Sequence, residues 1–110
     1  MKETNLHQYF RQSKDPKLCE VLYKCAMNYI NSNGYQIKEH QKKALLNHIT
    51  GMVKRNIDAE QINIQDKTIF NEVSQDSIEI SNKLMEKLEY IANDEIYLLS
   101  IHFETIRNNK

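Results

Sequence analysis

Two histidines stand in similar settings, and they are the residues of this chain best suited to chemistry. Residues 44–49 read ALLNHI around His48, and residues 98–103 read LLSIHF around His102. Each histidine has a leucine three residues before it and a large apolar residue directly after it. If both segments are helical, each ring is presented at the edge of an apolar stripe. A titratable nucleophile beside a packing surface suits a reversible chemical signal.

Charged residues recur at fixed spacings from these histidines. Arg55 follows His48 by seven residues, and Glu95 precedes His102 by seven, so each pair shares a helix face two turns apart. A phosphorylated histidine carries roughly two negative charges, which arginine is well shaped to receive. We therefore expect Arg55 to support a phosphoryl group on His48, with Arg107 a weaker, off-face candidate beside His102. Glu95 is expected to hold a ring nitrogen of His102 and fix its tautomer.

Each of these residues also has a plainer interpretation. A single histidine on an apolar stripe is usually a hydrogen-bonded core or boundary residue. Arg55 near a helix C-terminus and Glu95 in a first turn would both complement the helix dipole without further function. Seven residues span about 10 Å along a helix, so each pair needs bending side chains or a partner helix to meet. The matched surroundings of the two histidines strengthen the chemical interpretation, although leucines beside a helical histidine are common.

Other chemistries have weaker support in the sequence. His40 and His48 lack the HExxH spacing of a helical zinc site, and the two glycines form no phosphate-binding loop. Cys25 has no signature of a catalytic thiol. We therefore expect no metal, no cofactor and no enzymatic activity. An enzyme with a small pocket between helices is the least supported alternative, because it would need a compact set of converging acids and bases.

Composition limits the remaining classes. The 110 residues are 40% hydrophobic and 27% charged, which is typical of one globular domain. Fifteen basic residues balance fifteen acidic ones, so direct nucleic-acid binding is not expected. No apolar run approaches the ~20 residues of a membrane span, and no secretory signal is visible. Cys19 and Cys25 lie too far apart on one predicted helix for a disulfide, which favours the cytoplasm.

The spacing of apolar residues predicts an all-α protein, a compact bundle of five mostly antiparallel helices, four long and one short. A polar lead-in that frays is expected at residues 1–14, followed by a single helical domain at 15–110. The predicted helices run from Pro16, capped by Asp15, to Asn33-Gly34; from Ile37 to Asn56; briefly after Asp66; through Ile80 to Ile91; and from Asn93 through Ile106. Residues 57–65 are expected to form a loop.

The two histidine segments resemble the signatures of the PTS regulation domain, or PRD. Leu45-x-x-His48-Ile49 with Arg55 is similar to the first signature. Residues 94–103, DEIYLLSIHF, resemble the second, in which an acidic residue precedes Tyr-Leu and a histidine followed by an aromatic or aliphatic residue. The 54-residue interval between the histidines also suits the family. The likeness covers about residues 15–108, and the two signatures together are more specific than either alone.

The resemblance implies a compact five-helix domain that commonly dimerises and occurs in bacterial antiterminators and activators of sugar operons. It implies that His48 and His102 accept phosphoryl groups from the phosphocarrier HPr or from sugar-specific enzyme II components. Better-known members carry two such domains behind an RNA-binding or DNA-binding module, whereas one domain is expected here. The chain is therefore expected to act through an unknown regulatory partner protein. It is also expected to form a homodimer. The alternative is a passive helical interaction module in which both histidines are structural.

Overall fold

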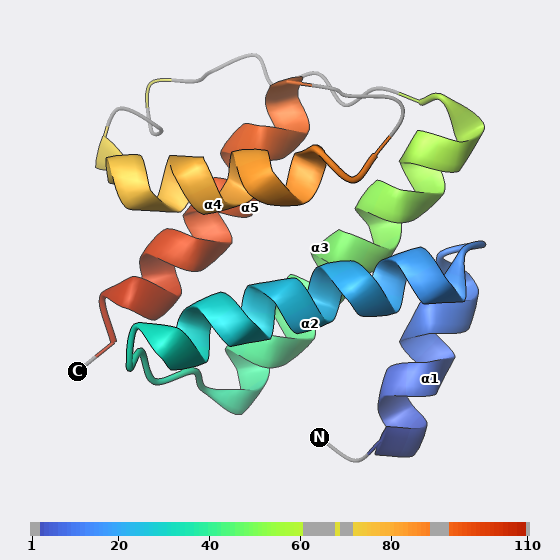
Figure 1. Cartoon of the computed structure of the whole chain (residues 1–110), viewed down its shortest axis with the longest axis horizontal. Coiled ribbons are helices and arrows are strands. Elements are labelled where there is room, and N and C mark those ends of the chain that lie inside the picture. The colour runs from blue at the N-terminus through green and yellow to red at the C-terminus, as the bar shows by residue number, and fades with distance from the viewer. Residues whose placement is uncertain (1–2, 61–67, 69–71, 89–92, 110) are drawn as a thin grey trace.

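The computed structural model describes residues 3–60, 68, 72–88 and 93–109 (Figure 1). These residues contain five α-helices and no β-strand, which confirms the all-α fold class. In chain order the helices are α1 (Glu3–Gln12), α2 (Pro16–Ser32), α3 (Glu39–Asp58), α4 (Gln75–Met85) and α5 (Asn93–Arg107).

The ends of α2 follow the local signals in the sequence. The Asp15 carboxylate accepts a hydrogen bond from the backbone N–H three residues on, at 3.1 Å, and Pro16 occupies the start of the helix. Beyond the other end, Gly34 takes a positive φ of 69°, which is open to glycine at little cost. This turn lets the Tyr35 N–H reach back to the Ile30 carbonyl at 3.1 Å. The sequence prediction for this helix is confirmed at both ends.

The N-terminal segment differs from the expected lead-in. Glu3–Gln12 forms α1, which packs against α2 and α3. Phe10 anchors the helix in the core, where its side chain is 5% exposed and its ring centroid lies 6.2 Å from that of Tyr23. A helix of this length is marginal on its own, and packing of the buried Phe10 against the other helices stabilises it.

The remaining helix boundaries shift by a few residues from the predicted ones. Helix α3 begins and ends two residues later than expected, and Ala59 follows it in the left-handed conformation. Helix α4 begins after Ser74, whose hydroxyl caps the helix, and ends at Met85. The predicted extension of this helix to Ile91 is wrong for residues 86–88, because the helix ends at Met85. Residues 89–91 lie outside the described residues, as does most of the short helix expected after Asp66.

The core lies among α2, α3, α4 and α5: helix α3 packs against α2 and α5, and α4 lies across α5 and also contacts α2 (Figure 1). Its fully buried side chains come from all four of these helices, and they include Leu22, Ile30, Leu45, Ile49, Leu84 and Phe103. Because α3 and α5 pack directly against each other, the two helices that carry His48 and His102 share one interface. Both cysteines are free, and none of the described helices is long and apolar enough to cross a membrane.

Candidate functional site

His48 from α3 and His102 from α5 lie side by side, although 54 residues separate them in the sequence. Their ring centroids are 5.1 Å apart and their planes are inclined by 37°. The local sequence pattern around each histidine contains no information about the distance between the two rings. The packing of α3 against α5 therefore turns two separate candidates into one site.

A carboxylate and a guanidinium complete the site. Arg55, in the last turn of α3, binds Glu95, in the first turn of α5, through two hydrogen bonds: Nε to Oε2 at 2.5 Å and Nη2 to Oε1 at 2.9 Å. The Glu95 side chain is only 3% exposed, whereas that of Arg55 is 24% exposed. This bidentate ion pair joins the C-terminal end of α3 to the N-terminal end of α5. The same two helices carry His48 and His102.

The structure gives Glu95 different partners from the one the spacing suggested. Its Oε1 lies 3.8 Å from Nε2 of His48, on the opposite helix. Among the described residues it contacts His48 and Arg55, not His102. The reason is geometric: His102 lies two turns further along the same helix, while α3 passes directly opposite the first turn of α5.

Gly51 makes room for the Arg55 guanidinium. A Cβ atom at this position would lie 2.9 Å from Nη1 of Arg55, closer than ordinary contacts allow. A glycine inside a helix often marks the close approach of another backbone. The structure instead shows an arginine side chain of the same helix folded back over the glycine. Sequence analysis missed Gly51 as part of the site, although its place four residues before Arg55 was a usable signal.

Burial keeps both imidazoles neutral. The His48 side chain is 10% exposed, and its buried Nε2 has no hydrogen-bond partner among the described residues. Burial lowers the pKa of His48 to about 3, and the charge that His102 would carry if protonated and the charge of Arg55 act in the same direction. Burial also lowers the pKa of His102. A neutral imidazole keeps a lone pair on one ring nitrogen, so both rings are chemically able to act as nucleophiles.

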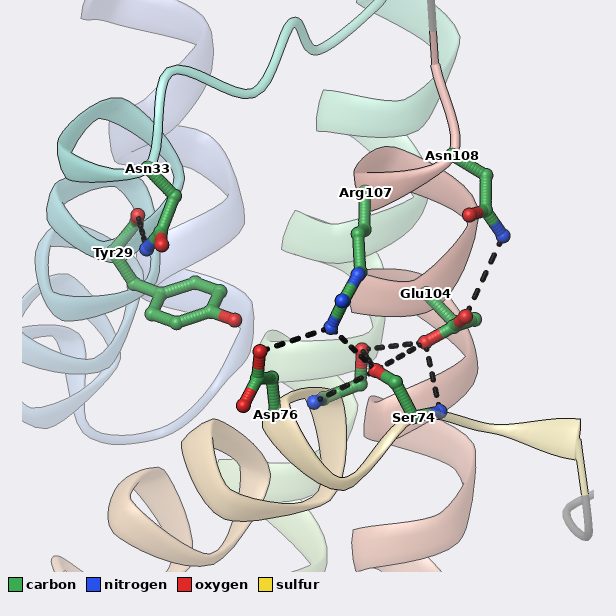
Figure 2. Close-up of polar contacts among 8 residues, drawn as sticks. Tyr29, Asn33, Ser74, Asp76, Glu104, Arg107 and Asn108 are labelled. Carbon is green, nitrogen blue, oxygen red and sulfur yellow. Dashed lines mark hydrogen bonds and ion pairs between the residues drawn. The ribbon is translucent and has the colours of Figure 1, made fainter.

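Arg107 binds elsewhere (Figure 2). Its Nη1 donates to the Ser74 hydroxyl at 2.9 Å and to Oδ2 of Asp76 at 3.1 Å, both at the start of α4. The same Ser74 donates its N–H and its hydroxyl to the Glu104 carboxylate, at 3.0 and 2.7 Å. Five residues turn a helix by about 140° beyond a full turn, which aims Arg107 away from the face of His102. Arg107 and Glu104 thus fasten the end of α5 to the start of α4.

A cavity of about 210 Å³ lies beside this second cluster, lined by Tyr29, Asn33, Asp76, Glu79, Ile80 and Lys83. Burial and the neighbouring Tyr35 raise the pKa of Tyr29 to about 12. The lining includes neither histidine of the pair. The pocket therefore adds no acid or base to the histidine site.

Comparisons with known proteins identify the family of the chain. The PRD domain family model matches residues 23–106, a span that contains His48, Arg55, Glu95 and His102. The chain is also similar to the crystal structure of a PRD-containing transcription regulator from Lactobacillus casei ATCC 334, with a TM-score of 0.84 and 27% sequence identity. That match covers 98% of this chain and 96% of the other. No curated protein sequence matches at a significant level. The chain belongs to the PRD family, as the two histidine signatures predicted.

Proposed function

We propose that this chain is a phosphorylation-responsive regulatory domain of the sugar phosphotransferase system, with His48 and His102 as phosphoryl acceptors. The observation that carries the proposal is the contact between two neutral imidazoles beside an arginine–carboxylate pair. The PRD family match and the similarity to a PRD-containing transcription regulator support a role in regulating transcription of carbohydrate operons. The domain itself is proposed to be non-enzymatic.

The chemistry of transfer is simple at this site. The lone pair of a ring nitrogen forms a bond to phosphorus, while the donor's bond to phosphorus breaks and its electron pair stays on the donor. The new group adds about two negative charges. Glu95 repels this charge and Arg55 attracts it, so the proposed response is an exchange of Arg55 from the carboxylate to the phosphoryl group.

Because little of the His48 side chain is exposed, the exchange of Arg55 affects the packing of the helices around it. With only 10% of the His48 side chain exposed, a protein donor reaches the ring only if α3 and α5 part locally. Once charged, the site cannot close again without a partner for the phosphoryl group and for Glu95. Phosphorylation is therefore proposed to alter the α3–α5 interface, and through it a homodimer or the binding of a regulatory partner protein.

The test begins with phosphoenolpyruvate, enzyme I, HPr and candidate enzyme II proteins, followed by intact mass measurement. We expect an acid-labile gain of phosphoryl mass on the wild type and a reduced gain in His48→Gln or His102→Gln. His40→Gln is the matched control, because His40 is exposed on the same helix α3 and lies outside the site. If the wild type gains no such mass with any donor, the proposal is wrong.

Light scattering of the same samples tests the response. A change in oligomeric state or in partner binding after phosphorylation, absent in a double His48→Gln and His102→Gln variant, supports a switch. Unchanged partner binding in the double variant, combined with no phosphorylation of the wild type, would instead favour the passive interaction module. The proposed donors are cytoplasmic, so the chain is proposed to work in the cytoplasm, without direct contact with nucleic acid.

A further inference from the structure

We propose that the His48–His102 pair accepts one phosphoryl group at a time, so that occupation of either ring excludes the other. This inference rests on the proposed function and specifies its regulation. Both histidines remain acceptors, but they are alternative positions for one charge rather than two independent sites.

The first argument is distance. The ring centroids are 5.1 Å apart, and the two rings are held on helices that pack against each other. As long as α3 and α5 stay packed against each other, groups bonded to these rings remain close whichever nitrogens carry them. Each phosphoryl group carries about two negative charges, and repulsion between them is strong in a site from which water is largely excluded.

The second argument is the supply of positive charge. Arg55 is the cation whose field reaches the His48 ring, and its guanidinium already neutralises Glu95. A first phosphoryl group competes with Glu95 for this one cation. A second group would have to share Arg55, because Arg107, the arginine of α5, is bound to Ser74 and Asp76 at the start of α4. The site therefore contains three potential anions and one arginine.

Mutual exclusion of the two phosphorylations determines what the domain can signal. Two different donors, each directed at one histidine, would produce the same singly charged site. The domain would then report that a phosphoryl group is present, regardless of which donor supplied it. Each transfer is balanced, because one bond to phosphorus forms at the ring nitrogen and one breaks at the donor. Once one ring is phosphorylated, the second donor does not phosphorylate the other.

The experiment uses the full chain carrying His7→Gln and His40→Gln, so that the pair contains the only two histidines. Phosphoramidate, a small phosphoryl donor for imidazole, replaces the protein donors. Intact mass gives the fractions with one and two groups, and peptide mapping gives the occupancy of each ring. Adding His48→Gln or His102→Gln gives the occupancy of each ring alone, with far-UV circular dichroism to show that each variant is folded.

Exclusion predicts that the doubly modified fraction is at least about tenfold below the product of the two single-ring occupancies. A doubly modified fraction equal to that product would overturn exclusion and leave the proposed function intact. Modification of the same single ring in every protein would also overturn it, because there would be no competition. If neither phosphoramidate nor HPr modifies either ring, the proposed function and this inference both fail.

Discussion

Replacing His48 by glutamine is expected to flatten the dependence of folding stability on pH between about 7.5 and 5.5. In the folded chain burial lowers the pKa of His48 to about 3, against an ordinary value of 6.5. Between these values the unfolded chain binds a proton that the folded chain does not. The stability that this group contributes is therefore complete above pH 6.5 and is lost as the pH falls below it.

The size of the effect follows from the same values. One pH unit below 6.5, at pH 5.5, protonation of His48 in the unfolded chain lowers the free energy of unfolding by about 1.4 kcal/mol. The lowered pKa of His102 acts in the same direction. Burial alone would raise the carboxyl pKa of Glu104, but hydrogen bonds from Ser74 and Ser77 and the charge of Arg107 outweigh it and lower the pKa below 4.5. Hydrogen bonds and the charge of Lys42 lower the pKa of Glu39 as well, so the contributions of both carboxylates are lost at more acidic pH. The chosen window therefore isolates the histidines.

Urea unfolding followed by circular dichroism at pH 7.5, 6.5 and 5.5 measures the effect. The wild type should lose at least about 1.4 kcal/mol across the window, while His48→Gln should keep only the smaller loss due to His102. His40→Gln, on the exposed side of α3, should retain the wild-type slope. Equal slopes for wild type and His48→Gln would refute the argument that burial lowers the pKa of this ring in the folded chain.

Other substitutions test the remaining contacts. Arg55→Met leaves the buried Glu95 carboxylate unpaired and should cost about 3–5 kcal/mol in urea unfolding, whereas Glu95→Gln leaves an arginine that can turn to water and should cost about 1–2; equal costs would contradict this. Gly51→Ala should gain no stability in the wild type, because the new Cβ displaces Arg55, but should gain about 1 kcal/mol in Arg55→Met. Ser74→Ala removes the α4 cap and a hydrogen bond to Glu104, which should cost about 1–2 kcal/mol and speed amide exchange at the start of α4.

Sequence reasoning succeeded where the physical cause is local. The Asp15 side chain caps the amides just beyond it, and Gly34 makes the left-handed turn that ends α2, so both signals lie within a few residues of their effect. The position of each histidine on an apolar face is equally local, and it led to the correct family. These features need no knowledge of which helices are neighbours.

Sequence reasoning was less successful for side-chain contacts that depend on which helix lies opposite. Glu95 has His102 on its own helix, but its partners are Arg55 and His48 across the interface. Phe10 anchors α1 only because a pocket of other helices receives it, so the preceding polar residues looked like a loose lead-in. Helical spacing predicts which residues share a face, and it contains no information about what lies opposite that face.

The pairing of Glu95 with residues of α3 also connects the histidine site to the rest of the domain. If a phosphoryl group takes Arg55, the carboxylate of Glu95, now 3% exposed, must reach water, and the first turn of α5 must move to let it. Helix α5 is one continuous element, and its far end is fastened to the start of α4 by the hydrogen bonds between Glu104 and Ser74. A displacement that begins at Glu95 would therefore reach α4 without any further contact to the histidines. Exchange of Arg55 at the N-terminal end of α5 would thus be coupled through this helix to the contact between Glu104 and Ser74 at its C-terminal end.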